Sequence, residues 1–205
     1  MTNLDTLIAH FEKFPGIGAR QARRFAFHIL RLPENETQEL AYLITNLQTS
    51  VQECSRCYRY FSKNGSQMQQ CSICRDPNRD HKKLMVLERD TDIQSIERSQ
   101  TYDGLYFVLG GTIPLLNTKE KNKLRAQALK AAVEMQFTEG LKEIILGFSV
   151  NPDGENTARY VQELLKDTIS SKGITVTMLG RGLSTGSELE YADPETIKNA
   201  LRNRA

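Results

Sequence analysis

The chain has two parts that differ in their pattern of apolar and polar residues. Up to about residue 52, apolar side chains recur at the three- and four-residue spacing of a helix face. From about residue 80, short apolar runs alternate with longer amphipathic segments. The first pattern is typical of packed helices, and the second is typical of an α/β sheet with strands buried on both faces.

Three amphipathic helices are predicted in the first part, each with apolar residues at i, i+3, i+4 and i+7. The segment Phe14-Pro15-Gly16-Ile17-Gly18 separates the first two helices, and Pro33 ends the second. The apolar positions are Leu4, Leu7, Ile8 and Phe11 in the first helix, Ala22, Phe25, Ala26, Ile29 and Leu30 in the second, and Leu40, Leu43, Ile44, Leu47 and Val51 in the third.

The second part predicts a parallel sheet, so the fold class is α/β here and multi-domain α+β over the whole chain. A last helix is predicted to begin at Pro194 with Asp193 as its N-cap. The predicted strands occupy residues 84–87, 105–109, 144–148 and 174–179, and the helices between them occupy about 92–100, 120–137 and 155–171.

Composition excludes several classes of protein. The chain has 39% hydrophobic residues among 205 and a mean hydropathy of -0.47, which suits packed cores and is too polar for a membrane protein. No apolar stretch is long enough for a transmembrane helix, and the N-terminus lacks the apolar core of a signal peptide. We therefore expect a cytoplasmic protein whose cysteines are not paired in disulfides.

The formal net charge of +2 hides two basic runs that contain no acidic residue. Such runs predict a surface that faces a polyanion, although ordinary solvated faces would give the same pattern. Aromatic residues Tyr58, Tyr60 and Phe61 are interleaved with the second run. Residues 13–33 contain Lys13, Arg20, Arg23, Arg24 and Arg31, and residues 54–75 contain Arg56, Arg59, Lys63 and Arg75.

The four cysteines give the strongest local signal. Cys54 and Cys57 form one Cys-x2-Cys knuckle, Cys71 and Cys74 form another, and Asn64-Gly65 predicts a hairpin turn between the two. Four thiolates complete a tetrahedral shell, so we expect one structural zinc ion per protomer. Iron, redox chemistry and four unrelated thiols are the alternatives that the spacing leaves open.

The turn between the first two helices predicts a phosphate-binding site. Gly16 and Gly18, on either side of Ile17, permit a tight turn that exposes backbone N–H groups at the start of the next helix. Arg20, Arg23 and Arg24 follow within two helical turns and add positive charge. The sequence therefore predicts contact with DNA phosphates at this hairpin, whereas a plain turn between helices is the alternative.

Three segments carry a resemblance to a known family. They are FPGIGARQARRFAFHIL at the hairpin, CSICRDPNRD at the second knuckle and GRGLSTGSELEYADPETI near the C-terminus. In this order the chain resembles the RecR family of bacterial recombination mediators along essentially its whole length. The resemblance implies a non-enzymatic DNA-repair protein that binds single- or double-stranded DNA. It would act with the RecO and RecF proteins to load recombinase on single-stranded DNA.

The resemblance also implies a division into four parts and a ring-like tetramer. Residues 1–53 would form a helix-hairpin-helix DNA-binding domain, and residues 54–79 a four-cysteine zinc finger. Residues 80–179 would form a Toprim domain, and residues 180–205 an arm and helix that contact a neighbouring protomer.

A Toprim fold ordinarily holds Mg2+ with a glutamate after its first strand and an Asp-x-Asp after a later one. Glu88 matches the glutamate, but Ser149 and Asn151 align with the two aspartates. An alternative gapped alignment places Asn151-Pro152-Asp153 on the motif and supplies one acid. Asp153 and Glu155 lie just beyond and give at most a weak Mg2+ site. We therefore expect no catalytic residue here, and we interpret the three acids as a degenerate cluster or as a contact for a basic partner.

Two other classes of function are compatible with parts of the sequence. A Toprim-type, Mg2+-dependent nuclease or primase-like enzyme fits the fold, but the missing Asp-x-Asp opposes it. A zinc-stabilised scaffold that binds protein and not DNA fits the cysteines, but the basic hairpin opposes it.

Overall fold

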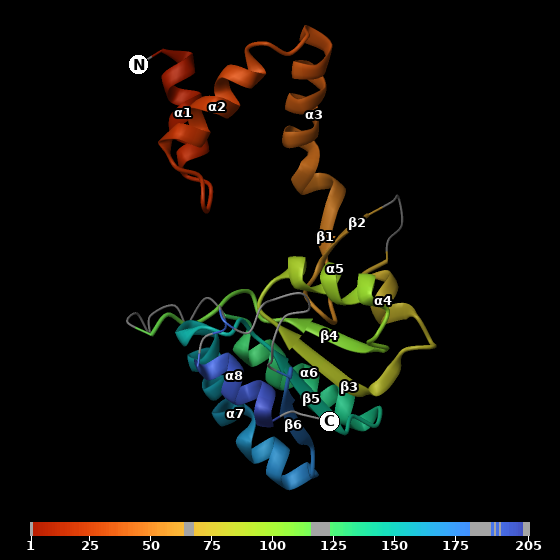
Figure 1. The fold of residues 1–205 in the computed structure, drawn as a ribbon. Coiled ribbons are helices and arrows are strands. Elements are labelled where there is room, and N and C mark those ends of the chain that lie inside the picture. The colour runs from red at the N-terminus through yellow and green to blue at the C-terminus, as the bar shows by residue number, and fades with distance from the viewer. Residues whose placement is uncertain are drawn as a thin grey trace. The chain divides into compact units, whose positions relative to one another are not determined.

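The computed structural model describes residues 2–63, 68–115, 124–180, 190, 192 and 194–202 (Figure 1). The chain forms two compact units, Met1–Gln52 and Glu53–Ala205. In the described part, no helix combines the length and the apolar character needed to span a membrane.

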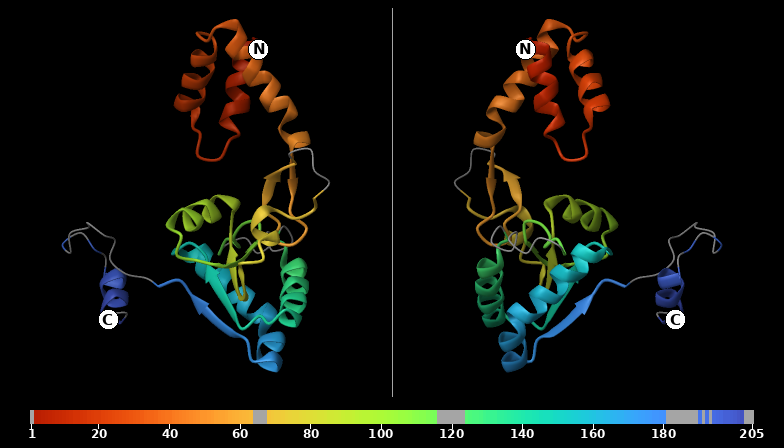
Figure 2. Two further views of the ribbon diagram at one scale, coloured as in Figure 1. Left: turned by 90° about the vertical axis from the view of Figure 1, so that its right-hand side faces the viewer. Right: turned by 90° about the vertical axis from the view of Figure 1, so that its left-hand side faces the viewer.

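The first unit contains the three predicted helices. They are α1 (Asn3–Glu12), α2 (Ala19–Ile29) and α3 (Glu34–Ser50). Thr2 and Asp5 form a reciprocal cap at the start of α1, and Pro33 directly precedes α3. The helices α1 and α2 lie side by side, joined by the hairpin (Figure 2).

The apolar face of α2 is buried only in part. Ala22 and Ala26 are fully buried, and Phe11 of α1 packs edge to face against Phe14 and Phe25 at ring distances of 5.8 and 5.9 Å. Leu30, which the apolar repeat includes, is exposed.

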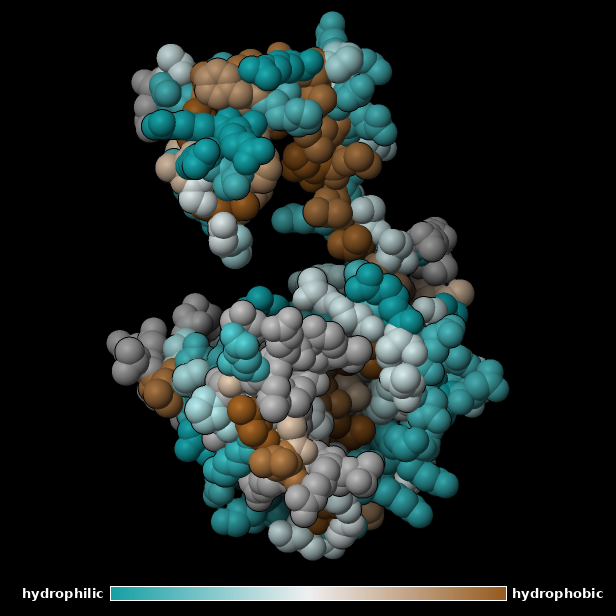
Figure 3. Space-filling model, viewed as in Figure 1, coloured by the Kyte–Doolittle hydropathy of each residue, from teal (hydrophilic) through white to brown (hydrophobic). Residues whose placement is uncertain are grey.

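The apolar side chains predicted for α3 are not covered in the described part of the chain. Leu43, Ile44 and Leu47 are each more than half exposed, together with Tyr42. Figure 3 shows hydrophobic residues gathered on the surface of α3. The spacing therefore predicted the helix correctly, but the described residues of the first unit leave its apolar face exposed.

The second unit begins with the cysteine segment. Strands β1 (Val51–Glu53) and β2 (Tyr60–Ser62) form a two-stranded ribbon, and α4 (Ser72–Arg75) carries Cys74. Strand β2 thus pairs across the first knuckle, with a strand that precedes Cys54. The predicted turn at Asn64-Gly65 lies outside the described residues.

The predicted parallel sheet is confirmed. It contains β3 (Asp80–Leu87), β4 (Gly104–Val108), β5 (Glu143–Gly147) and β6 (Thr175–Met178) in the order β4-β3-β5-β6, and all neighbouring pairs are parallel. The connecting helices are α5 (Asp90–Ser99), α6 (Ala126–Thr138) and α7 (Pro152–Lys172).

The C-terminal helix α8 (Pro194–Arg202) begins where the sequence predicted it. Its predicted N-cap, Asp193, lies outside the described residues, as does most of the arm before it, residues 181–189.

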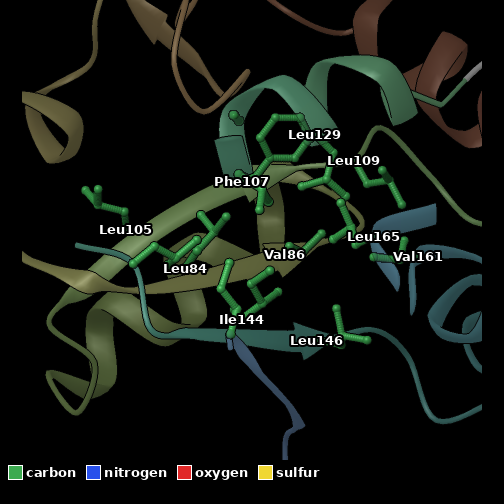
Figure 4. Close-up of a cluster of buried hydrophobic side chains, with 14 of the residues drawn as sticks. Leu84, Val86, Leu105, Phe107, Leu109, Leu129, Ile144, Leu146, Val161 and Leu165 are labelled. Atoms are coloured by element: carbon green, nitrogen blue, oxygen red, sulfur yellow. The ribbon is translucent and has the colours of Figure 1, made fainter. Parts of the chain in front are cut away.

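Each face of the sheet has its own core. On one face, side chains of β3, β4 and β5 such as Val86, Phe107 and Ile144 pack against α6 and α7 (Figure 4). On the other face, α5 and the cysteine segment cover the alternate side chains of the same strands. This arrangement follows from the period of two in a strand, which points successive side chains to opposite faces.

Candidate functional site

The four predicted metal ligands lie together. The Sγ atoms of Cys54, Cys57, Cys71 and Cys74 are all within 4.8 Å of one another, and those of Cys57 and Cys71 are 3.7 Å apart. The backbone N–H of Cys71 donates to Cys54 Sγ at 3.3 Å. The thiols of Cys57, Cys71 and Cys74 lower the pKa of Cys54 through hydrogen bonds, so its thiolate form is stabilised.

The cluster has the size and burial of a closed metal site. In a tetrahedral zinc site with Zn–S distances of about 2.3 Å, the sulfur atoms lie about 3.8 Å apart. The 3.7 Å separation of Cys57 and Cys71 fits this value. All four side chains are buried, which leaves no open position for water or substrate. The residues present therefore fit a structural metal ion.

The cysteines are also part of the core beneath the sheet. They pack in one cluster with Ile93 of α5 and with side chains of β3 and β4, which are Met85, Leu87, Tyr106 and Val108. The N–H of Val108 donates to the Cys57 carbonyl at 2.8 Å. The cysteine segment and the sheet therefore form one packed body.

A buried arginine in the first knuckle strengthens this junction. Arg56 lies between Cys54 and Cys57, is only 9% exposed and forms an ion pair with Glu139 at the end of α6. His81 Nδ1 lies 2.9 Å from the same carboxylate oxygen. Although burial opposes the charge of Glu139, the hydrogen bonds from Arg56 and His81 lower its pKa.

A second arginine makes contacts on both sides of the same junction. Arg125 forms an ion pair with Glu53, donates to the Val108 carbonyl at 3.1 Å and lies 5.5 Å from the centre of the Tyr58 ring. The Tyr58 ring lies 5.2 Å from that of Phe107 in β4. Sequence reasoning missed these contacts because their partners lie far apart in the chain and share no motif.

The CSICRDPNRD segment contributes a further structural contact. Arg79 forms an ion pair with Glu97 of α5 and donates to the Tyr102 carbonyl at 3.3 Å. The Tyr106 hydroxyl donates to the same Glu97 at 2.6 Å. Hydrogen bonding to Glu97 raises the pKa of Arg79, so this guanidinium stays charged. Its place in the motif is explained by the packing of α5 against the sheet.

The predicted phosphate-binding hairpin has the expected local geometry. Gly16 has φ +75°, a left-handed conformation that favours glycine, and the Ile17 N–H donates to the Phe14 carbonyl at 3.1 Å. Gly18 is the N-cap of α2 and has no side-chain oxygen to cap it. The Gln21 N–H donates to the Gly18 carbonyl at 3.0 Å, whereas the N–H groups of Ala19 and Arg20 have no backbone acceptor in the described chain. These two groups can bond an anion.

The arginines after this hairpin are exposed. Arg20, Arg23 and Arg24 all lie on the surface of α2, and no ion pair within residues 2–52 involves them. Arg24 makes a 3.4 Å hydrogen bond with Gln21. The first turns of α2 therefore present uncompensated positive charge next to the exposed N–H groups.

The Toprim-like glutamate lies where the strand order of the sheet reverses. Glu88 follows β3 and Ser149 follows β5, and the carboxyl ends of these two neighbouring strands flank the position at which α/β folds bind ligands. Glu88 is 7% exposed, and the Ser149 hydroxyl donates to it at 2.9 Å. In a metal-binding site of this kind, a second acidic residue and this carboxylate would bind the ion together. Here the serine hydroxyl forms a hydrogen bond with the carboxylate instead.

The other two acids are held elsewhere. Asp153 accepts a hydrogen bond from the Leu115 N–H at 3.0 Å, and Glu155 is exposed on the first turn of α7. Asn151 is the N-cap of α7, where its side chain accepts from the Gly154 N–H at 2.8 Å. A Cβ at Gly154 would lie 2.0 Å from the Ser149 carbonyl oxygen, so glycine is required for this close approach.

Among the described residues, the four cysteines are the only group of three or more side chains placed to hold a metal ion. Glu88, Asp153 and Glu155 are not brought together at ligand distance in that part of the chain. The described chain thus contains one closed thiolate site, and its three Toprim-like acids are dispersed, with Glu88 buried and Glu155 exposed.

Comparisons with protein families match three segments of the chain. Residues 4–47 match the family described as "RecR, helix-hairpin-helix", residues 82–179 match "Toprim domain", and residues 182–205 match "RecR, C-terminal".

Curated relatives with the name "Recombination protein RecR" match nearly the full chain, and three of them illustrate the similarity. The protein from Chloroflexus aggregans is 40% identical over 198 residues, which are 97% of this chain and 91% of the relative. Those from Pediococcus pentosaceus and Rubrobacter xylanophilus are each 37% identical. They cover 97% and 98% of this chain and 94% and 96% of their own lengths.

Proposed function

Because this chain belongs to the RecR family of recombination proteins, we propose that it is a DNA-repair mediator that binds DNA phosphates at the hairpin before α2. The observation that carries the DNA contact is the helix start at Gly18, with N–H groups and exposed arginines on one side. Phosphate contacts of this kind position a protein on DNA and carry no base information.

The test uses a double variant in which both Arg20 and Arg24 are changed to alanine. We expect weaker binding to every DNA sequence and a shallower plot of log affinity against log salt, by about one unit for each phosphate that the variant no longer binds. Fluorescence anisotropy across a salt series measures both quantities.

A control with the same change of charge is Arg98→Ala with Lys166→Ala, since both side chains are exposed on helices of the second unit. We expect the control to keep the wild-type affinity and slope. If the Arg20 and Arg24 variant keeps both as well, the hairpin is only a turn. A chain that shows no salt-dependent DNA binding would support the scaffold alternative.

We also propose that the ion bound by the four cysteines is zinc, one per protomer, with a structural role. The support is the closed, buried set of four thiolates. Bound zinc would supply cross-linking of the two knuckles and no reaction chemistry.

We propose no catalytic residue in the Toprim-like part. Glu88 is bonded to Ser149, which cannot share a divalent ion as an aspartate does. Glu88, Asp153 and Glu155 would instead tolerate neutralisation without loss of DNA binding, and of the three the exposed carboxylate of Glu155 best suits a basic surface on a partner protein. The RecO and RecF proteins are the partners that family membership favours.

The remaining assignments follow from the family and from the exposed surfaces. We propose a homo-oligomer, with a tetrameric ring as its form, because the apolar face of α3 has no cover in the described chain. We assign residues 1–53, 54–79, 80–179 and 180–205 as functional parts, the last as an assembly contact. The proposed location is the cytoplasm, where bacterial DNA lies.

A further inference from the structure

One aromatic side chain of α2 lies outside the apolar repeat of that helix. Phe27 is 47% exposed and takes no part in the ring cluster of Phe11, Phe14 and Phe25. The buried side of α2 is formed by Ala22 and Ala26, which are fully covered. Phe27 therefore contributes little to the packing between α1 and α2, and its exposure needs another explanation.

The neighbours of Phe27 on the helix surface are arginines. Residues three and four apart are adjacent on a helix face, which places Arg23 and Arg24 one turn before Phe27 and Arg31 one turn after it. Arg20 lies one further turn toward the hairpin on the same face. All four arginines are exposed, and residues 13–33 contain no acid.

An exposed ring among cations is suited to a flat, apolar partner that carries negative charge. Nucleic acid bases have such faces, and they are accessible for stacking when the strand is single. In duplex DNA the base faces are already stacked on one another, and a protein reaches only their edges through the grooves. A membrane offers the charge but no planar partner for the ring, and an acidic peptide offers a planar face only where it carries an aromatic side chain. A single strand of DNA places a planar base beside every phosphate.

We propose that Phe27 stacks on a base of single-stranded DNA while the arginines around it hold the phosphates, so that this face of α2 distinguishes single-stranded from duplex DNA. This inference rests on the proposed function, because it requires DNA at the hairpin face. It adds a strand preference that phosphate contacts alone do not supply.

The test compares three ligands of equal length: oligo-dT, a duplex, and a strand in which the central nucleotides are abasic. The abasic strand keeps the phosphates and removes the faces for stacking. Wild-type protein should bind oligo-dT more tightly than the abasic strand. Phe27→Ala should weaken binding to oligo-dT by about five-fold or more, given the usual energy of base–aromatic stacking. It should leave the duplex and abasic affinities unchanged.

Two matched variants separate stacking from loss of apolar surface. Phe27→Leu keeps the bulk and removes the ring, so it should behave like Phe27→Ala. Leu30→Ala removes an exposed apolar side chain at the end of the same helix and should bind like wild type. Circular dichroism of each variant should match wild type, because the changed side chains are exposed.

A fluorescent readout is available because the chain contains no tryptophan. In Phe27→Trp the single indole would report directly on this position. We expect its fluorescence to be quenched by oligo-dT and not by the abasic strand.

Specific results would overturn the proposal. They are equal weakening of all three ligands by Phe27→Ala, wild-type binding of that variant to oligo-dT, and absence of quenching in Phe27→Trp. A changed solution mass of Phe27→Ala would instead indicate that a second copy of the chain covers the ring. Failure of the proposed function is a different result, in which Arg20→Ala with Arg24→Ala leaves every affinity and salt slope unchanged.

Discussion

The two acid-free basic runs look alike in sequence and differ in structure. In the first run, Arg20, Arg23 and Arg24 are exposed on α2. In the second run, Arg56 is buried against Glu139, and Arg59 has its Nε atom buried without a hydrogen-bond partner in the described chain. The first run thus presents its charge to solvent, whereas part of the second is used to pack the cysteine segment on the sheet.

The difference lies in where the neutralising acid comes from. Arg56 and Glu139 are 83 residues apart, so a count of charge along the chain cannot pair them. The first run lies in a small unit that offers its arginines no such partner among residues 2–52. A basic run therefore predicts a polyanion-binding face only where the fold leaves its charges unpaired.

The largest expected effect comes from breaking the metal site with Cys71→Ser. Structural zinc sites contribute about 10–16 kcal/mol of apparent binding energy in finger peptides, so loss of one thiolate should remove most of the metal affinity. Because the cysteines share a core with Met85, Leu87 and Tyr106, we expect the sheet to lose stability as well. Metal analysis and thermal unfolding measure the two effects.

The control for this variant is Ser72→Ala, which changes an exposed neighbour in the same knuckle. It should keep one metal ion per chain and the wild-type melting temperature. Hydrogen exchange should show increased opening of β3 and β4 in Cys71→Ser and unchanged protection of α1 and α2. Full metal content in Cys71→Ser would refute the four-thiolate site.

An intermediate effect is expected when the buried ion pair is broken. Arg56→Ala or Glu139→Gln should destabilise the second unit by about 1–3 kcal/mol. Breaking a fully buried ion pair costs about 3–5 kcal/mol. The cost is smaller here because Glu139 is about one-third exposed. Denaturant titration measures this loss. Wild-type stability in both variants would show that the Arg56–Glu139 ion pair does not contribute to the junction.

The same pair gives a pH dependence. Folding lowers the pKa of Glu139 below its ordinary value of 4.5, so its contribution is complete above that value and declines as the pH falls through the folded pKa. Wild-type protein should therefore lose more stability than Glu139→Gln between neutral pH and the acid range. Parallel acid titrations of the two proteins would show no difference if the pair contributed nothing.

Much of the fold could be predicted because it depends on local patterns. The spacing of Leu4, Leu7, Ile8 and Phe11 is enough to place α1, and an apolar run such as residues 84–87 is enough to place a buried strand. The cysteine cluster followed from spacing as well, since each Cys-x2-Cys turn brings two thiolates to one side. These features need no knowledge of distant residues.

The contacts that join segments could not be predicted in the same way. The sequence around Arg56 does not indicate its ion pair with Glu139, which also contacts His81. The sequence around Ser149 does not indicate its hydrogen bond to Glu88. The exposure of the α3 apolar face could not be predicted either, because periodicity shows that a helix face is apolar but does not show what covers it. In each case the role of a residue depends on its partner in the folded chain, and the local sequence does not identify that partner.

The smallest expected effect, and the sharpest comparison of the two runs, comes from removing one exposed arginine from each. Arg23 is exposed on α2 in the first run, and Arg75 is exposed after the second knuckle, where it bonds the Gln70 carbonyl at 3.1 Å. Arg23→Ala should lower the salt slope of DNA binding by about one unit, whereas Arg75→Ala should leave it unchanged. Neither change should alter the melting temperature appreciably, so the two variants differ only in DNA binding. Equal reduction of the slope in both would mean that the exposed part of the cysteine segment also binds phosphates, and the contrast between the runs would then be confined to Arg56 and Arg59.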